Sequence, residues 1–128
     1  IFKICKEYIK KGFIIIVITN QAGIARGLYG VKDFYKITEW MIAEFKRRKI
    51  KIHKVYFCPH HPEFTGNCDC RKPKPGLIKK AVKDFNIDLK KSVLIGDKYT
   101  DIQAGINSGI ETNFLIRTNK LSDLKKKI

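Results

Sequence analysis

The sequence predicts an α/β fold built on a doubly wound, mainly parallel Rossmann-like sheet. Short β-branched segments alternate along the chain with longer segments whose apolar residues recur every three or four positions. This alternation is typical of parallel strands joined by helical crossovers. The chain has 128 residues, the size of one domain, and contains no repeat or linker. We therefore expect a single domain over 1–128.

The first helix and strand are expected within the first 19 residues. Apolar residues at helical spacing predict a helix from Ile1 to about Lys11, and Gly12 marks its end. The run Phe13–Thr19 is continuously apolar and β-branched, which indicates a strand buried on both faces.

A second helix and strand follow. The helix is expected over Val31–Lys49, and the strand over Lys54–Cys58. Four apolar residues predict the buried stripe of this helix, namely Phe34, Ile37, Met41 and Phe45.

The second half of the chain repeats the alternation twice. Helices are expected over Leu77–Phe85 and Ile102–Asn107, and strands over Ser92–Ile95 and Thr112–Ile116. Gly109 ends the last helix.

Three of the four cysteines and two of the three histidines lie between residues 58 and 70. Cys58 with His60, and Cys68 with Cys70, give four thiolate and imidazole ligands, which suit a tetrahedral structural zinc site. His61 is the substitute for His60, and a disulfide with incidental histidines is the alternative. We predict a zinc-stapled loop over 58–70, which would hold the following cations Arg71 and Lys72 in fixed positions.

The formal net charge is +15, but the basic residues are scattered between elements. A nucleic-acid site would combine a continuous basic stripe with available aromatic residues. Here Phe34, Trp40 and Phe45 lie among the apolar positions of expected core helices, which favours a solvated basic surface. No apolar run approaches the roughly 20 residues of a membrane span. We expect a soluble, cytoplasmic monomer.

Polar residues follow two of the predicted strands, where parallel sheets bind ligands. Thr19, Asn20 and Gln21 offer a hydroxyl, amides and backbone N–H groups to a phosphate, although they are also ordinary turn formers. Asp97 ends a later strand and Asp101 lies one helical turn beyond. Carboxylates there suit Mg²⁺, and helix capping is the alternative, above all for Asp101.

Three segments together resemble the haloacid-dehalogenase-like (HAD-like) phosphatases. They are TNQAGIARGLYG, which contains Thr19, CPHHPEFTGNCDCRKPKPG, which contains Lys72, and GDKYTDIQAG, which contains Asp97 and Asp101. The cysteine-rich segment is similar to the branch containing heptose bisphosphate and histidinol-phosphate phosphatases, and all three look most like the heptose bisphosphate group.

This resemblance implies Mg²⁺-dependent hydrolysis of a sugar phosphate. Thr19 and Lys72 would stabilise the transferring phosphoryl group, and Asp97 would hold Mg²⁺. The implied substrate-binding residues also include Asn20, Gln21, Ala22, Arg71 and Lys98.

The family's catalytic Asp-x-Asp pair has no counterpart in the sequence. The chain opens in the helix that would follow the strand bearing this pair. We therefore expect that this first, central strand is missing, that a gap separates the strands ending at Thr19 and Asp97, and that the chain alone is inactive. A polynucleotide 3′-phosphatase, a histidinol-phosphate phosphatase and a nonenzymatic zinc-stapled binding module remain alternatives.

Overall fold

The computed structural model describes residues 1–61, 63, 66 and 68–116. Its strands form two parallel pairs, one of β1 (Ile15–Asn20) with β2 (Ile52–Cys58), the other of β3 (Val93–Gly96) with β4 (Thr112–Leu115). Parallel strands alternating with helices confirm the predicted α/β class. In the described residues β1 and β3 are not paired with each other, and this division falls where the sequence predicts a gap.

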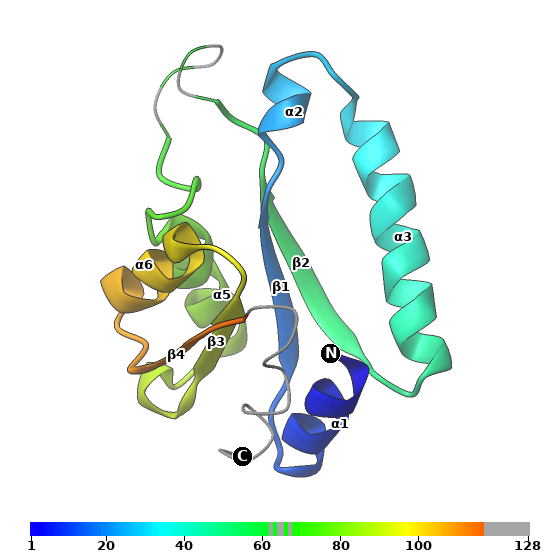
Figure 1. The fold of residues 1–128 in the computed structure, drawn as a ribbon, viewed down its shortest axis with the longest axis vertical. Coiled ribbons are helices and arrows are strands. Elements are labelled where there is room, and N and C mark those ends of the chain that lie inside the picture. The colour runs from blue at the N-terminus through cyan, green and yellow to red at the C-terminus, as the bar shows by residue number, and fades with distance from the viewer. Residues whose placement is uncertain (62, 64–65, 67, 117–128) are drawn as a thin grey trace.

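Helices lie on both sides of the strands (Figure 1). Their bounds are α1 (Phe2–Lys10), α2 (Ala22–Ala25), α3 (Val31–Arg47), α5 (Gly76–Phe85), the 3-10 turn η1 (Leu89–Lys91) and α6 (Tyr99–Ser108). The short α2 and η1 were not predicted, and α6 begins three residues earlier than expected. No helix in the described ranges is long and apolar enough to cross a bilayer.

The apolar core joins the two strand pairs. Ile78 of α5 and Ala104 of α6 are buried together with Ile110, and they pack against Ile18 of β1 and Leu94 of β3. Removing this apolar surface from water is favourable by roughly 25 cal/mol per Å². The cluster therefore holds β1 and β3 in one body although they share no ladder of hydrogen bonds.

On the opposite side, α1 and α3 cover different strands. Ile4 and Tyr8 of α1 pack against residues of β3 and β4. Phe34 of α3 packs on Phe57 of β2, with ring centroids 4.4 Å apart. The β1–β2 pair thus lies between α3 and α5, and the β3–β4 pair lies between α1 and α6.

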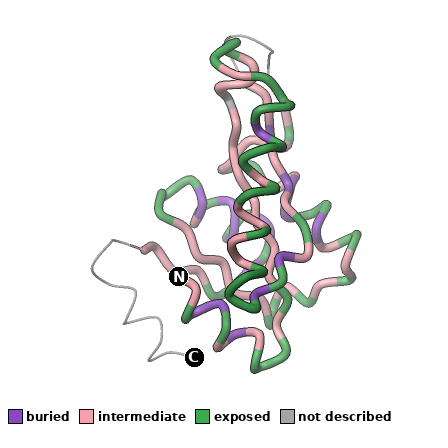
Figure 2. The backbone as a smooth tube through the Cα atoms, turned by 90° about the vertical axis from the view of Figure 1, so that its right-hand side faces the viewer, coloured by how far each residue is buried: buried purple, intermediate pink, exposed green. Residues whose placement is uncertain are grey.

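Two expectations about burial were wrong. Ile37 and Trp40 of α3 are each 66% exposed, and much of this helix is drawn as exposed in Figure 2. Ile37 borders an apolar cavity of about 460 Å³ between α3 and β1, which Val17 and Met41 also line, whereas Trp40 is not among the residues that line it. The strand β1 is only partly buried along its length, since it has one strand neighbour and borders this cavity.

The hydroxyl of Tyr56 donates to Asp84 Oδ2 at 2.6 Å and ties β2 to α5. Burial, then the hydrogen bond and the charge of Asp84, raise the pKa of Tyr56 to about 12. The unfolded phenol ionises near pH 10, so this contribution to stability is complete below about pH 10 and is lost as the pH rises towards 12.

We expect Tyr56→Phe to lower the free energy of unfolding by about 1 kcal/mol at neutral pH. Denaturant titrations should show this deficit shrinking as the pH rises from about 10 to 12, because only the wild type loses the contribution. Tyr35→Phe, at a half-exposed tyrosine of α3, is the matched control. A deficit that is constant with pH would contradict the assignment.

Candidate active site

A polar cavity of about 590 Å³ opens where β1 and β3 end. It is lined by Thr19, Asn20, Arg71, Lys72, Asp97, Lys98, Thr100 and Asp101. Three segments distant in sequence supply these residues, namely the end of β1, the loop before α5 and the start of α6. The carboxyl ends of parallel strands are the usual place for a ligand in such folds.

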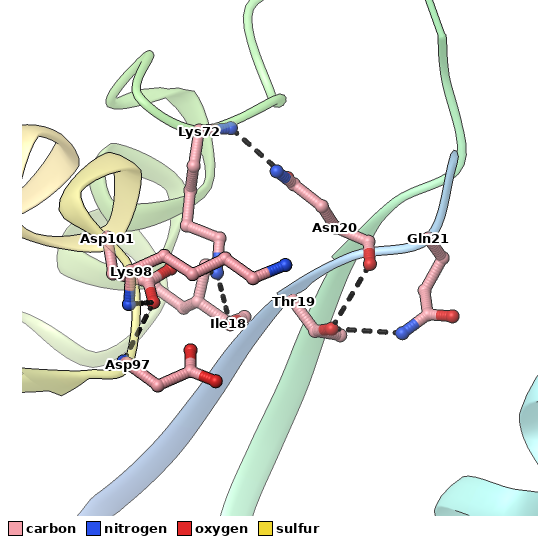
Figure 3. A network of polar contacts seen from close by, with 8 residues as sticks. All are labelled: Ile18, Thr19, Asn20, Gln21, Lys72, Asp97, Lys98 and Asp101. Atoms are coloured by element: carbon pink, nitrogen blue, oxygen red, sulfur yellow. Dashed lines mark hydrogen bonds and ion pairs between the residues drawn. The ribbon is translucent and has the colours of Figure 1, made fainter. Parts of the chain in front are cut away.

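Lys72 occupies the centre of this arrangement (Figure 3). Its ammonium group forms an ion pair with Asp101 Oδ1 and lies 3.4 Å from the carbonyl oxygen of Ile18 on β1. Its backbone N–H donates to Asn20 Oδ1 at 3.1 Å. The Lys72 side chain is only 15% exposed, so both the main chain and the ammonium are fixed against β1.

Asp101 connects Lys72 to the start of α6. Its Oδ2 accepts hydrogen bonds from the backbone N–H groups of Asp97 and Lys98, both at 3.1 Å. The capping alternative for Asp101 is therefore confirmed. A Cβ at Gly96 would overlap the Asp101 side chain, so the end of β3 needs glycine there.

Burial acts to raise the pKa of Asp101, but the hydrogen bond and positive charge of Lys72, with the Lys98 backbone, outweigh burial. The net result is a pKa below the ordinary value of 3.8. Asp101 is thus an ionised carboxylate whose oxygens already have partners. Asp101 therefore has a structural role. In the described residues Asp97 is the other carboxylate that lines the cavity, and it remains available to a ligand.

The cavity carries an excess of positive charge. Arg71, Lys72 and Lys98 contribute cations, against the carboxylates of Asp97 and Asp101. Arg71 Nη1 is buried without a hydrogen-bond partner in the described residues. Buried donors are rarely left unpaired, so an acceptor atom of a bound ligand would satisfy this group.

Six of the seven predicted phosphate- and substrate-binding side chains with described positions line this cavity, and Gln21 does not. Gln21 lines the apolar cavity beside α3, and its Nε2 donates to Thr19 Oγ1 at 2.9 Å. Thr19 borders both cavities. Ala22 is the first residue of α2.

The four predicted zinc ligands converge beside the end of β2. The ligand atoms of Cys58, His60, Cys68 and Cys70 all lie within 4.8 Å of one another. Cys68 Sγ is 3.5 Å from the sulfurs of both Cys58 and Cys70, and His60 Nδ1 is 3.3 Å from Cys70 Sγ. His61 is not part of this group.

Cys58 and Cys70 are joined as a disulfide in the structure, which was the alternative to zinc. However, a disulfide needs only two of the four groups. Zn–S bonds of about 2.3 Å give edges of about 3.8 Å in a tetrahedron, close to the contacts that Cys68 and His60 make with this pair. The donor set therefore fits zinc once both cysteines are reduced.

The loop after Cys70 is held by two short contacts. The Gly76 N–H donates to the Asp69 carbonyl at 3.0 Å, and Lys74 Nζ donates to the Cys68 carbonyl at 2.6 Å. Arg71 and Lys72 lie within the segment that these bonds close. The cysteine cluster and the start of α5 therefore fix the backbone that carries both cations.

Sequence reasoning missed three contacts around the site. It did not pair Lys72 with Asp101, and it did not single out Tyr29, whose hydroxyl donates to Gln21 Oε1. It also missed Asn107 Nδ2, which donates to the Pro73 carbonyl at 3.1 Å and links α6 to the Lys72 loop. Only the position of Asp101 in the first turn of α6 gave a signal in the sequence.

Curated relatives match most of the chain. A D-glycero-alpha-D-manno-heptose-1,7-bisphosphate 7-phosphatase from Campylobacter jejuni is 42% identical over 94% of this chain and 67% of the relative. The D-glycero-beta-D-manno-heptose-1,7-bisphosphate 7-phosphatases of Yersinia pestis and Escherichia coli are each 42% identical, over 91% and 90% of this chain. The chain spans about two thirds of the length of these relatives, 63–67%.

Solved structures share the fold. A D,D-heptose 1,7-bisphosphate phosphatase from B. bronchiseptica, complexed with magnesium and phosphate, has a TM-score of 0.83 at 24% identity, covering 99% of this chain and 69% of that one. A HAD-like phosphatase from Mesorhizobium loti has a TM-score of 0.81 at 29% identity, over 89% of this chain and 56% of that one. The HAD-hydrolase-like family matches residues 69–127. The predicted HAD-like fold is confirmed.

We expect Asp101→Asn to destabilise the fold by about 3–5 kcal/mol at neutral pH, because Lys72 would remain buried without its counter-ion. The folded pKa of Asp101 is lowered, so its contribution is complete above pH 3.8 and is lost as the pH falls through the lower folded value.

Denaturant titrations of both proteins should therefore show a difference that narrows below about pH 4. Glu111→Gln, at an exposed carboxylate, is the charge-matched control. An equally large difference at acid and neutral pH would show that ionisation of Asp101 does not stabilise the fold.

Proposed function

The chain belongs to the D-glycero-D-manno-heptose-1,7-bisphosphate 7-phosphatase family of HAD-hydrolase-like proteins, and on this premise we propose that it serves Mg²⁺-dependent hydrolysis of a sugar phosphomonoester. The substrate is the C7 phosphate of a heptose 1,7-bisphosphate, the reaction that the curated relatives are named for. We further propose that the protein works as a cytoplasmic monomer. The single observation that carries the proposal is the fixed Lys72 ammonium in a cavity with Thr19 and Asp97.

Thr19 and Lys72 would bind the phosphoryl group during its transfer. The transferred group carries negative charge on its equatorial oxygens, and preorganised donors and cations lower the barrier most. Lys72 meets this requirement because its contacts with Asp101 and Ile18 fix the ammonium before substrate arrives. The Thr19 hydroxyl provides the second donor.

Asp97 would hold the catalytic Mg²⁺. This ion is usually bound by one or two carboxylates together with substrate phosphate and water, and Asp97 is the lining carboxylate not already engaged by Lys72. The bound ion would neutralise charge on the phosphate and orient it.

The remaining polar residues would recognise the rest of the substrate. Arg71 suits a second phosphate through its bidentate fork, and its buried Nη1 lacks a partner among the described residues. Lys98 lies beside Asp97 and would contact the substrate close to the metal. Asn20, Gln21 and Ala22 would form the substrate loop.

The nucleophile would come from a strand outside the described residues. Asp97 and Asp101 are the two carboxylates that line the cavity in the described part of the chain, and both are assigned other roles. Among the described strands, β1 and β3 each leave one edge unpaired, which favours a strand between them that carries an Asp-x-Asp pair. Its carboxylates would then lie beside Thr19 and Asp97.

Phosphate release from heptose 1,7-bisphosphate tests this assignment. We expect none from residues 1–128 alone, and Mg²⁺-dependent release after fusion to an N-terminal strand that carries the family's Asp-x-Asp pair. Both anomers should be supplied, because relatives are named for each. Activity of residues 1–128 alone would refute the placement of the nucleophile, and an inactive, folded fusion would favour the binding-module alternative.

In the active fusion, Lys72→Ala should lower kcat by roughly 10²–10³-fold, the typical cost of one transition-state donor. Lys79→Ala, at an exposed lysine of α5, is the control and should have wild-type kcat. Circular dichroism should show that both variants fold. Equal kcat values for the two variants would remove Lys72 from the mechanism.

We also propose that Cys58, His60, Cys68 and Cys70 bind one structural zinc ion. Protein purified under reducing conditions should contain one zinc per chain. The thiols of Cys58, Cys68 and Cys70 should react with a thiol reagent only after a chelator has removed the metal. Cys68→Ser should lose the metal, whereas Cys5→Ser, at a buried thiol outside the cluster, should retain it. A zinc-free protein with a stable Cys58–Cys70 disulfide under reducing conditions would contradict the zinc site.

A further inference from the structure

A line of hydrogen bonds leads from Tyr29 to the end of β1. The Tyr29 hydroxyl donates to Gln21 Oε1, and Gln21 Nε2 donates to Thr19 Oγ1 at 2.9 Å. Thr19 Oγ1 in turn lies 3.4 Å from the Asn20 carbonyl oxygen. Tyr29 is therefore linked through the Gln21 amide to Thr19, which lines the polar cavity, although Tyr29 does not line that cavity itself.

The donors and acceptors in this line can be counted. A tyrosine hydroxyl has one proton, and here Gln21 Oε1 accepts it, so the opposite end of the amide must present its N–H groups to Thr19. The Thr19 oxygen then acts as an acceptor, and its own proton is free to be donated. The 3.4 Å contact with Asn20 is at the weak end of the hydrogen-bond range. A phosphate oxygen would form a shorter, charge-assisted bond with that proton.

Packing holds Tyr29 in this position. Its ring lies against the backbone of Gly23, where an added Cβ would be 3.0 Å from Tyr29 Cζ. The Leu28 N–H donates to the Gly23 carbonyl at 2.9 Å and closes the turn. Tyr29, Gln21 and Thr19 also line the largely apolar cavity beside α3, and hydrogen bonds are stronger in such surroundings.

In the structure the tyrosine proton is donated to Gln21 Oε1, which favours the amide orientation with Nε2 towards Thr19. Without the tyrosine hydroxyl this preference is lost, and the reversed orientation becomes accessible. In the reversed orientation Oε1 faces Thr19 and accepts the Thr19 proton. That proton is the one which a phosphate oxygen requires, because a fully ionised phosphate has none to give. Loss of Tyr29 thus creates an internal competitor for the Thr19 hydroxyl.

We propose that Tyr29 is a positioning residue that, through Gln21, keeps the Thr19 hydroxyl as a hydrogen-bond donor to the substrate phosphate. This inference rests on the proposed function, because it requires that Thr19 binds phosphate. Tyr29 itself does not contact the substrate. The role depends on how residues 21–30 fold, because this loop brings Tyr29 back to Gln21 at its start.

Calorimetric binding of inorganic phosphate in the presence of Mg²⁺ tests the proposal on the whole 128-residue chain. Tyr29→Phe should raise the Kd about three- to ten-fold, as expected for one neutral hydrogen bond. Tyr35→Phe, which removes a hydroxyl outside this line of bonds, should leave the Kd unchanged. Thr19→Val should weaken binding, and adding Tyr29→Phe to it should cause no further loss, because the effect of Tyr29 passes through Thr19.

A wild-type Kd for Tyr29→Phe, or independent effects that multiply in the double variant, would overturn the proposal. A second readout separates this from failure of the proposed function. In NMR spectra, the Gln21 side-chain amide protons should exchange slowly with water in the wild type and faster in Tyr29→Phe. If the wild type binds no phosphate, the proposed phosphate site at Thr19 and Lys72 fails, and unchanged Gln21 exchange would independently refute the role of Tyr29.

Discussion

The ion pair between Lys72 and Asp101 crosses the space between the two strand pairs. Lys72 belongs to the loop before α5 and reaches the Ile18 carbonyl on β1, whereas Asp101 caps the start of α6 beside the end of β3. Both side chains are largely buried, so each needs the other to avoid an uncompensated charge. Because β1 and β3 share no ladder in the described residues, this pair and the apolar cluster beneath it set how the two halves of the site face each other.

The same constraint prepares the cavity for a phosphate. The Lys72 side chain is held by Asp101 and the Ile18 carbonyl, and its backbone is held by Asn20. Its ammonium is therefore in place before the negative charge of the transferring phosphoryl group develops. The cysteine cluster fixes the loop from one side, and the Asn107–Pro73 contact fixes it from α6. Contacts outside the cavity therefore fix the loop that carries Lys72.

Local patterns predicted the four longer helices, the strands and the clustering of Cys58, His60, Cys68 and Cys70, because each depends on residues close in sequence. The partner of Lys72 could not be predicted, since it is 29 residues away and its position depends on how α6 packs. Trp40 was misjudged because helical spacing identifies an apolar face but not whether anything covers it. The Gln21–Tyr29 contact depends on the fold of one loop, for which the sequence contains no periodic signal.

The central claim is that Thr19, Lys72 and Asp97 form one phosphate- and Mg²⁺-binding site. A crystal structure of the chain with Mg²⁺ and inorganic phosphate tests this most directly. We predict phosphate oxygens within hydrogen-bonding distance of Thr19 Oγ1 and Lys72 Nζ, with the ion on an Asp97 oxygen and Asp101 still paired with Lys72. Phosphate bound elsewhere, or an ion coordinated by Asp101 with Lys72 displaced from the cavity, would contradict the account.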